Sequence, residues 1–154
     1  MSKYPFVTYN PEGSDGKIQI RRTVPRDHTH QHKLFELVYV VRGTAKRRIQ
    51  DATIPVAPGD YYVADPFSAH GHEDIQDCEI IGCLFLPEYI DRALADCPSI
   101  SSLLSHRMLH FGVPVDIPLA DRVLHDTDGS VGRIMRKMER EHGEARMGYM
   151  EMLR

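Results

Sequence analysis

The sequence of 154 residues contains no tryptophan, only three cysteines and no long apolar run. Cys78, Cys83 and Cys97 form no CxxC pair and are odd in number, so we expect reduced thiols rather than a disulfide framework. No stretch approaches the roughly 20 apolar residues of a membrane-spanning helix, and the N-terminal MSKYPFVTYN lacks the apolar core of a signal peptide. These absences predict a cytoplasmic protein that does not associate with a membrane.

The chain also lacks a strong excess of either charge. Its formal net charge is −3, so the composition gives no indication of direct binding to nucleic acid. A hydrophobic content of 42% and a charged content of 27% are ordinary for a soluble globular protein. The length suits one domain with its own core.

The first half of the chain predicts a mainly β structure. Up to about Leu86 it contains short apolar or alternating segments separated by turn residues, and several short strands at close spacing are typical of a barrel or a sandwich. Gly43 lies between two of these segments, so we expect a hairpin at this glycine. The predicted strands are 17–23, 35–43, 45–50, 61–64 and 78–87.

After Pro87 the apolar residues recur at helical spacing, which predicts helices over 87–97 and 130–143. Another apolar stripe begins at Met147, and the sequence ends within about one turn of Leu153, so we interpret it as a helix cut before its natural end. The helix over 130–143 carries one apolar stripe, formed by Val131, Ile134, Met135 and Met138.

Histidines gather just before the apolar segment FELVYVV. His30, His32 and Glu36 are all even-numbered, as are Val38 and Val40, and alternate residues of an extended chain point to the same side. A buried carboxylate costs several kcal/mol unless it is paired, hydrogen-bonded or bound to a metal. Because imidazole and carboxylate are ligands of first-row transition metals, this pattern is consistent with a metal site in the interior.

A second histidine-containing segment, SAHGHE, follows the turn at Gly59. If a strand pair brings this segment beside HTHQHKLFE, His70 completes a set of three histidines and one glutamate. His72 shares the parity of His70, so we expect it to line the same pocket.

These two segments resemble the two conserved motifs of the cupin superfamily. The resemblance implies a mainly β fold, a cupin-type double-stranded jelly-roll barrel followed by C-terminal α-helices. In metal-binding cupins the matching residues are the ligands, here His30, His32, Glu36 and His70. The first motif is represented by His30, His32, Glu36 and Gly43, and the second by Gly59, Asp60, Pro66 and His70.

A longer run resembles the N-terminal sensor domain of AraC/XylS transcription regulators, close to the rhamnose-regulator type. The resemblance covers roughly residues 17–154 and implies an N-terminal arm over 1–16, a barrel core over 17–86, and a helical and connecting segment over 87–154. We expect a further barrel strand near 107–117. In that family a DNA-binding domain follows, and nothing in this chain matches it, so any contact with DNA belongs to a region outside it.

The candidate site leaves two alternatives open. The histidine–glutamate set holds one divalent transition metal (Zn, Ni, Fe or Mn), or it lines an organic-effector pocket without metal. Arg22 shares the parity of Ile18 and Ile20, so it meets an anionic effector or a sugar hydroxyl if that strand lines the barrel, and is otherwise solvated. His72 and Val38 are further candidates for ligand contact.

The leading functional hypothesis is an effector-sensing and dimerisation domain of an AraC-type regulator, which binds a small molecule, with a sugar as one candidate, and forms a homodimer. The resemblance implies dimerisation through Val131, Ile134, Met135 and Met138, and packing of this stripe on its own barrel is the alternative. The alternative function is a stand-alone metal-dependent cupin enzyme, such as a dioxygenase, isomerase or decarboxylase. A structural dimer module with an empty barrel is a third hypothesis.

Overall fold

The structure is a computed structural model that describes residues 18–49, 51–90, 97–102 and 122–144, together with Pro5, Val7, Arg92 and Ala95. The strands are β1 (Ile18–Thr23), β2 (Phe35–Ile49), β3 (Ala52–Val56), β4 (Asp60–Ala64), β5 (His70–Phe85) and β6 (Leu124–His125). The helices are α1 (Pro87–Ile90) and α3 (Ser130–Glu144).

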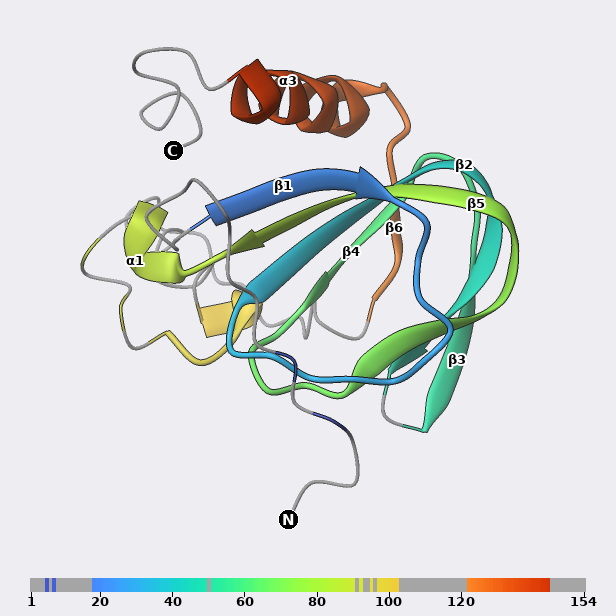
Figure 1. Ribbon diagram of the computed structural model, residues 1–154, viewed down its shortest axis with the longest axis horizontal. Coiled ribbons are helices and arrows are strands. Elements are labelled where there is room, and N and C mark those ends of the chain that lie inside the picture. The colour runs from blue at the N-terminus through green and yellow to red at the C-terminus, as the bar shows by residue number, and fades with distance from the viewer. Residues whose placement is uncertain are drawn as a thin grey trace.

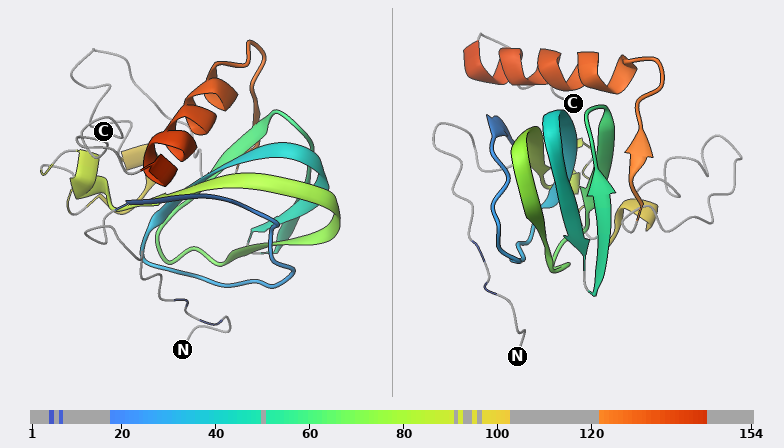
Figure 2. Two further views of the ribbon diagram at one scale, coloured as in Figure 1. Left: turned by 45° about the horizontal axis from the view of Figure 1, so that its top comes forward. Right: turned by 90° about the vertical axis from the view of Figure 1, so that its right-hand side faces the viewer.

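The strands form one antiparallel sheet in the order β1-β5-β2-β4-β6, with β3 paired to the second half of β2. β2 and β5 are the longest strands, with 15 and 16 residues, and they pair along most of their length. Both strands curve, so that the sheet folds back on itself into a barrel, while α3 lies across its outside (Figure 1 and Figure 2). The predicted mainly β barrel followed by a C-terminal helix is therefore confirmed.

The hairpin that we predicted at Gly43 is wrong. β2 continues through this glycine, and its register against β5 shifts between Val40 and Lys46. Gly43 has a φ of +68°, and a Cβ there would lie 2.1 Å from the carbonyl oxygen of Asp77 in β5. The glycine therefore allows a bulge and a close approach of two backbones within a continuous strand, rather than a chain reversal.

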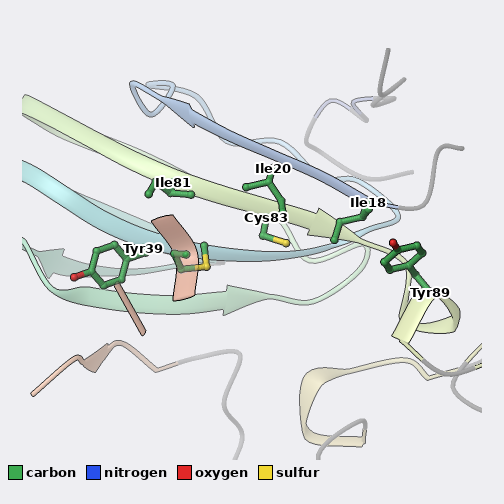
Figure 3. Close-up of a cluster of buried hydrophobic side chains, with 7 residues drawn as sticks. Ile18, Ile20, Tyr39, Ile81, Cys83 and Tyr89 are labelled. Carbon is green, nitrogen blue, oxygen red and sulfur yellow. The ribbon is translucent and has the colours of Figure 1, made fainter. Parts of the chain in front are cut away.

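Helix α3 packs on the outer face of the sheet over β1, β2 and β5. Its Met135 is 1% exposed and lies in a cluster of apolar residues from these strands and α1. The other members of the cluster are Ile18, Ile20, Tyr39, Ile81, Cys83 and Tyr89, shown in Figure 3. Burial of this apolar face explains why the amphipathic pattern of 130–143 correctly predicted the helix.

The apolar stripe of α3 is divided between the barrel and solvent. Met135 is buried, and Val131 and Met138 pack against the same cluster, whereas Ile134 is 58% exposed. Packing on the barrel of its own chain, the alternative for this stripe, is thus found for Val131, Met135 and Met138, and dimerisation through the stripe stays a prediction. Of the four, only Ile134 presents a largely open apolar side chain to a second molecule.

A second apolar cluster fills the inside of the barrel. It includes Val38 and Val40 of β2, Tyr62 of β4 and Ile80 of β5, all at most 4% exposed. The even-numbered residues at the start of β2 therefore point inward, as the alternation predicted. The odd-numbered Tyr39 points outward, toward α3.

Some predictions fall outside the described residues. These are the strand expected near 107–117, the stripe that begins at Met147 and most of the arm over 1–16. The helix expected over 87–97 is confirmed only at its start, because α1 ends at Ile90, Ala95 lies in a turn and Cys97 lies outside any helix. Pro5 and Val7 of the arm make backbone hydrogen bonds to Gln31. The longest described helix has 15 residues, and in the described part of the chain none has the length and apolar content needed to cross a bilayer.

Candidate metal centre

Strand pairing brings the two histidine segments together. His30 and His70 form an isolated antiparallel bridge, with a 2.9 Å backbone hydrogen bond in each direction. His70 begins β5, while His30 and His32 precede β2, in which Glu36 is the second residue. Four side chains from two distant parts of the sequence therefore reach one point inside the barrel.

One potential ligand atom from each of the four residues lies within 4.8 Å of all the others. The Oε2 atom of Glu36 is 3.1 Å from Nε2 of His70 and 3.3 Å from Nε2 of His32. The side chains are shielded from solvent, with 1% of His32, 5% of His70 and 8% of His30 exposed. The structure thus confirms the juxtaposition predicted from the sequence.

Each of the three histidine rings is oriented by a backbone carbonyl two residues away. Nδ1 of His32 lies 3.0 Å from the carbonyl oxygen of Leu34, and Nδ1 of His70 lies 2.8 Å from that of Ser68. Nδ1 of His30 makes a longer contact of 3.4 Å with the carbonyl of His28. A carbonyl only accepts, so Nδ1 carries the hydrogen, and a neutral ring presents the Nε2 lone pair to the centre.

The four groups suit a cation at their centre. Where Nδ1 of His32 and of His70 carries the hydrogen of a neutral ring, the Nε2 lone pairs repel the Glu36 oxygen, and where Nε2 carries a hydrogen, it donates to that oxygen instead. Protons on the rings or a metal ion at the centre relieve this repulsion. Three imidazole nitrogens and one carboxylate oxygen are suitable ligands for Zn, Ni, Fe or Mn, so the residues present fit the metal that the fold family implies.

The electrostatics favour the ligand forms of Glu36 and His30. Burial raises the pKa of the Glu36 carboxyl, but the hydrogen bonds with His32 and His70 outweigh it and hold that pKa well below its usual range. Burial, together with the nearby His70, lowers the pKa of His30 to about 4. At neutral pH, Glu36 is therefore a carboxylate and His30 a neutral imidazole, as metal binding requires.

A cavity of about 40 Å³ adjoins the quartet formed by His30, His32, Glu36 and His70. Its wall contains three members of the quartet, His30, Glu36 and His70, together with residues of β1, β5 and the loop after β1. These further lining residues are Arg21, Thr23, Val24, Pro25, Arg26, His72 and Ile80. A small ligand could therefore reach the candidate metal centre from the side of β1.

Arg22 does not line this cavity. The apolar residues Ile18 and Ile20 of β1 face the helix side of the sheet, and Arg22 shares that face. Its guanidinium makes two hydrogen bonds of 2.8 and 2.9 Å to the carboxylate of Glu139 in α3. The prediction that Arg22 points into the barrel is thus wrong, and the neighbouring Arg21 points there instead.

The other two candidate contacts have different positions. His72 lines the cavity, as predicted, and is 8% exposed. Val38 lies in the apolar core and is absent from the cavity wall, so direct contact with a ligand in this cavity is not expected.

Sequence reasoning missed the support for His72. Its Nε2 makes a short hydrogen bond with the hydroxyl of Tyr62 in β4, and the guanidinium of Arg47 lies 4.4 Å from the Tyr62 ring centroid. Arg47 is 1% exposed and donates 2.8 Å and 3.1 Å hydrogen bonds to the carbonyls of Val63 and Arg122. No local signal connects these residues, because they are brought together only by strand pairing.

Comparisons with known proteins agree with this fold. The cupin domain family matches residues 7–81. A search of the curated proteins gives no match. A putative mannose-6-phosphate isomerase from Ralstonia eutropha is 15% identical, with a TM-score of 0.42, and the alignment covers 55% of this chain and 92% of that protein.

Two further solved structures are similar over parts of the chain. A predicted oxalate decarboxylase from Thermotoga maritima is 19% identical, with a TM-score of 0.38, over 44% of this chain and 64% of that one. ToxT from Vibrio cholerae, bound to (E)-4-(8-methylnaphthalen-1-yl)but-3-enoic acid, is 10% identical, with a TM-score of 0.48, over 80% of this chain and 48% of that one. At these identities the likenesses concern the fold alone. The barrel strands have the cupin fold, and the match of the cupin family to residues 7–81 supports a relation to the cupin superfamily.

Proposed function

We propose that this chain is the effector-sensing and dimerisation domain of an AraC-type transcription regulator. In this proposal the barrel holds a divalent transition metal on His30, His32, Glu36 and His70 and binds a small molecule beside it. The observation that supports sensing best is the position of β1 between the cavity and α3. Its Arg21 lines the cavity, while the next residue, Arg22, is paired with Glu139 of α3.

This connection supplies a physical route for a signal. A ligand that contacts Arg21 favours particular positions of β1, and the ion pair of Arg22 transmits those positions to α3. The ligand then shifts the population between arrangements of the barrel and the helix by its difference in affinity for them. The sequence resemblance to AraC/XylS sensor domains over residues 17–154 supports the same assignment.

DNA binding tests this function. The proposal assigns DNA contact to a region outside this chain, so the isolated chain should not bind duplex DNA at physiological salt. The protein from the complete reading frame should bind a specific promoter sequence, with an affinity that changes on addition of the effector. A complete protein that lacks specific DNA binding would contradict the regulator assignment.

Dimerisation in this proposal uses the open face of α3 around Ile134, which is 58% exposed. Ile134→Glu should shift the chain from dimer to monomer in sedimentation experiments, because a charge in an apolar contact is not solvated. Phe67→Glu is the matched control, since Phe67 is 65% exposed in the turn between β4 and β5. A dimer that survives Ile134→Glu unchanged excludes this face.

A stand-alone metal-dependent cupin enzyme is the second candidate. The observation that favours it is the complete ligand quartet beside an accessible cavity. A bound metal there would supply a Lewis acid or a site for oxygen activation. Metal-dependent turnover of a small carboxylate, without any specific DNA binding by the complete protein, would favour the enzyme.

A further inference from the structure

The cavity beside the quartet has an unusual balance of charge. Arg21 of β1 and Arg26 of the following loop both contribute to its wall. Glu36 is the only carboxylate among the described lining residues, and it belongs to the metal-binding quartet. Thr23 and His72 supply further polar groups, so hydrogen-bond donors dominate the polar part of this wall.

A metal ion makes this imbalance larger. A divalent ion would retain one positive charge after neutralisation by Glu36, and Arg21 and Arg26 add positively charged side chains to the wall. A wall in which positive charge predominates favours an anionic ligand. Guanidinium groups bind planar carboxylates through paired hydrogen bonds, which adds geometric selectivity to the charge.

The size and the remaining walls restrict the anion further. The cavity volume is about 40 Å³, whereas pockets that enclose drug-sized ligands measure roughly 300 Å³ or more. A hexose is therefore too large to enter without movement of the loop after β1. Ile80 and Val24 form an apolar part of the wall, and Val24 is 60% exposed, so a short alkyl group can lie there and extend outward.

We propose that this cavity binds a small carboxylate anion between the metal centre and the guanidinium groups of Arg21 and Arg26. The inference deepens the proposed function, on which it rests for the metal, because it names the chemical class of the effector. Arg21 is the inward neighbour of Arg22, so the anion contacts the strand that is paired with α3.

Arg21 and Arg22, which are adjacent in β1, provide a matched comparison. Arg21→Gln and Arg26→Gln each remove one positive charge from the cavity wall, and the double variant removes both. Arg22→Gln removes the same charge from the adjacent position, on the face that is paired with Glu139. None of these residues belongs to the ligand quartet, so metal content should be equal in all the proteins.

The experiment uses the zinc-loaded chain, with acetate, the neutral acetamide, sulfate and L-rhamnose as probes. Ligand NMR gives each dissociation constant, and elemental analysis of the same samples gives the zinc content. We expect acetate to bind at least about tenfold more tightly than acetamide, and the double variant to lose about tenfold or more in acetate affinity. Arg22→Gln should leave acetate affinity within about twofold of wild type, since its charge lies outside the cavity.

Four results would overturn the inference. Acetamide or L-rhamnose that binds as tightly as acetate would exclude an anion site. Sulfate that binds more tightly than acetate would exclude selectivity for a carboxylate. Acetate affinity that is unchanged in the double variant would show that the metal alone binds the anion. An Arg22→Gln variant that loses as much acetate affinity as the double variant would show a non-specific charge effect.

The failure of the proposed function gives a different pattern. If the chain retains no zinc, the metal centre is wrong, and acetate binding that still depends on Arg21 and Arg26 would support the cationic cavity on its own. If acetate binds as expected but does not change promoter binding by the complete protein, the carboxylate site stands and the sensing role is contradicted.

Discussion

The contact between α3 and β2 depends on the absence of a side chain at Gly132. A Cβ at this position would lie 2.5 Å from the hydroxyl oxygen of Tyr39 and 2.7 Å from the ring carbon that bears it. Tyr39 is 6% exposed and belongs to the cluster under the helix, so its ring has little room to move. Gly132→Ala must therefore displace either the helix or the ring.

Two opposing effects determine the size of this change. Overpacking of a well-packed site costs about 1–3 kcal/mol, whereas alanine is favoured over glycine in a helix by about 1 kcal/mol. Gly143→Ala, in the same helix, has nothing within 4 Å of the new Cβ and experiences only the second effect. We therefore expect Gly132→Ala to be less stable than Gly143→Ala by about 1–3 kcal/mol.

Urea unfolding of the two variants measures this difference. Tyr39→Phe removes the atom nearest the new Cβ. Gly132→Ala should therefore cost less stability in the Tyr39→Phe protein than it costs in wild type. Equal stability of Gly132→Ala and Gly143→Ala would refute the close packing of α3 on β2.

Two further predictions concern α3 and the cysteines. Arg22→Gln should cost about 0.5 kcal/mol at neutral pH, where it removes the ion pair with Glu139. The hydrogen bond from Arg22 lowers the pKa of Glu139 below its ordinary value of 4.5, so this stabilisation is present above that value and is lost as the pH falls through the lowered pKa. The difference in stability between wild type and variant should thus disappear as the pH falls below the lowered pKa of Glu139, and a difference that stays constant would argue against the pair. Burial raises the pKa of the Cys83 thiol to about 12, which disfavours the reactive thiolate. Iodoacetamide should therefore modify the half-buried Cys97 first and Cys83 only on unfolding. Mass spectrometry that shows the reverse order of modification would contradict the burial of Cys83 in the core.

The interior face of the barrel could be predicted because strands alternate. His32, Glu36 and Val38 share parity, and the structure places all three on the inner side of β2 or just before it. His70 could be added only through the spacing of the two cupin motifs, since nothing local to residue 70 indicates its partner. The bridge between His30 and His70 supplies that information.

The errors have a common origin in long-range packing. The alternation in β1 separated Ile20 and Arg22 from Arg21 correctly, but it could not show that the apolar face lies under a helix outside the barrel. The same omission left packing of the α3 stripe on its own barrel and contact with a second molecule as alternatives. At Gly43 the sequence could not distinguish a turn from a bulge, because both accept a positive φ, and the partner β5 decides between them.

The measurement that tests the central claim most directly is the metal content of the purified chain. Wild type, Glu36→Ala, His32→Ala and the control His28→Ala are compared by elemental analysis after exposure to Zn, Ni, Fe or Mn. His28 is exposed and its ring lies 5.3 Å from that of His30, so it tests proximity without membership of the quartet. We predict about one equivalent of a transition metal in wild type and His28→Ala, and its loss in the other two variants. A wild-type chain that folds but retains no metal, or equal retention by all four proteins, would contradict the metal centre.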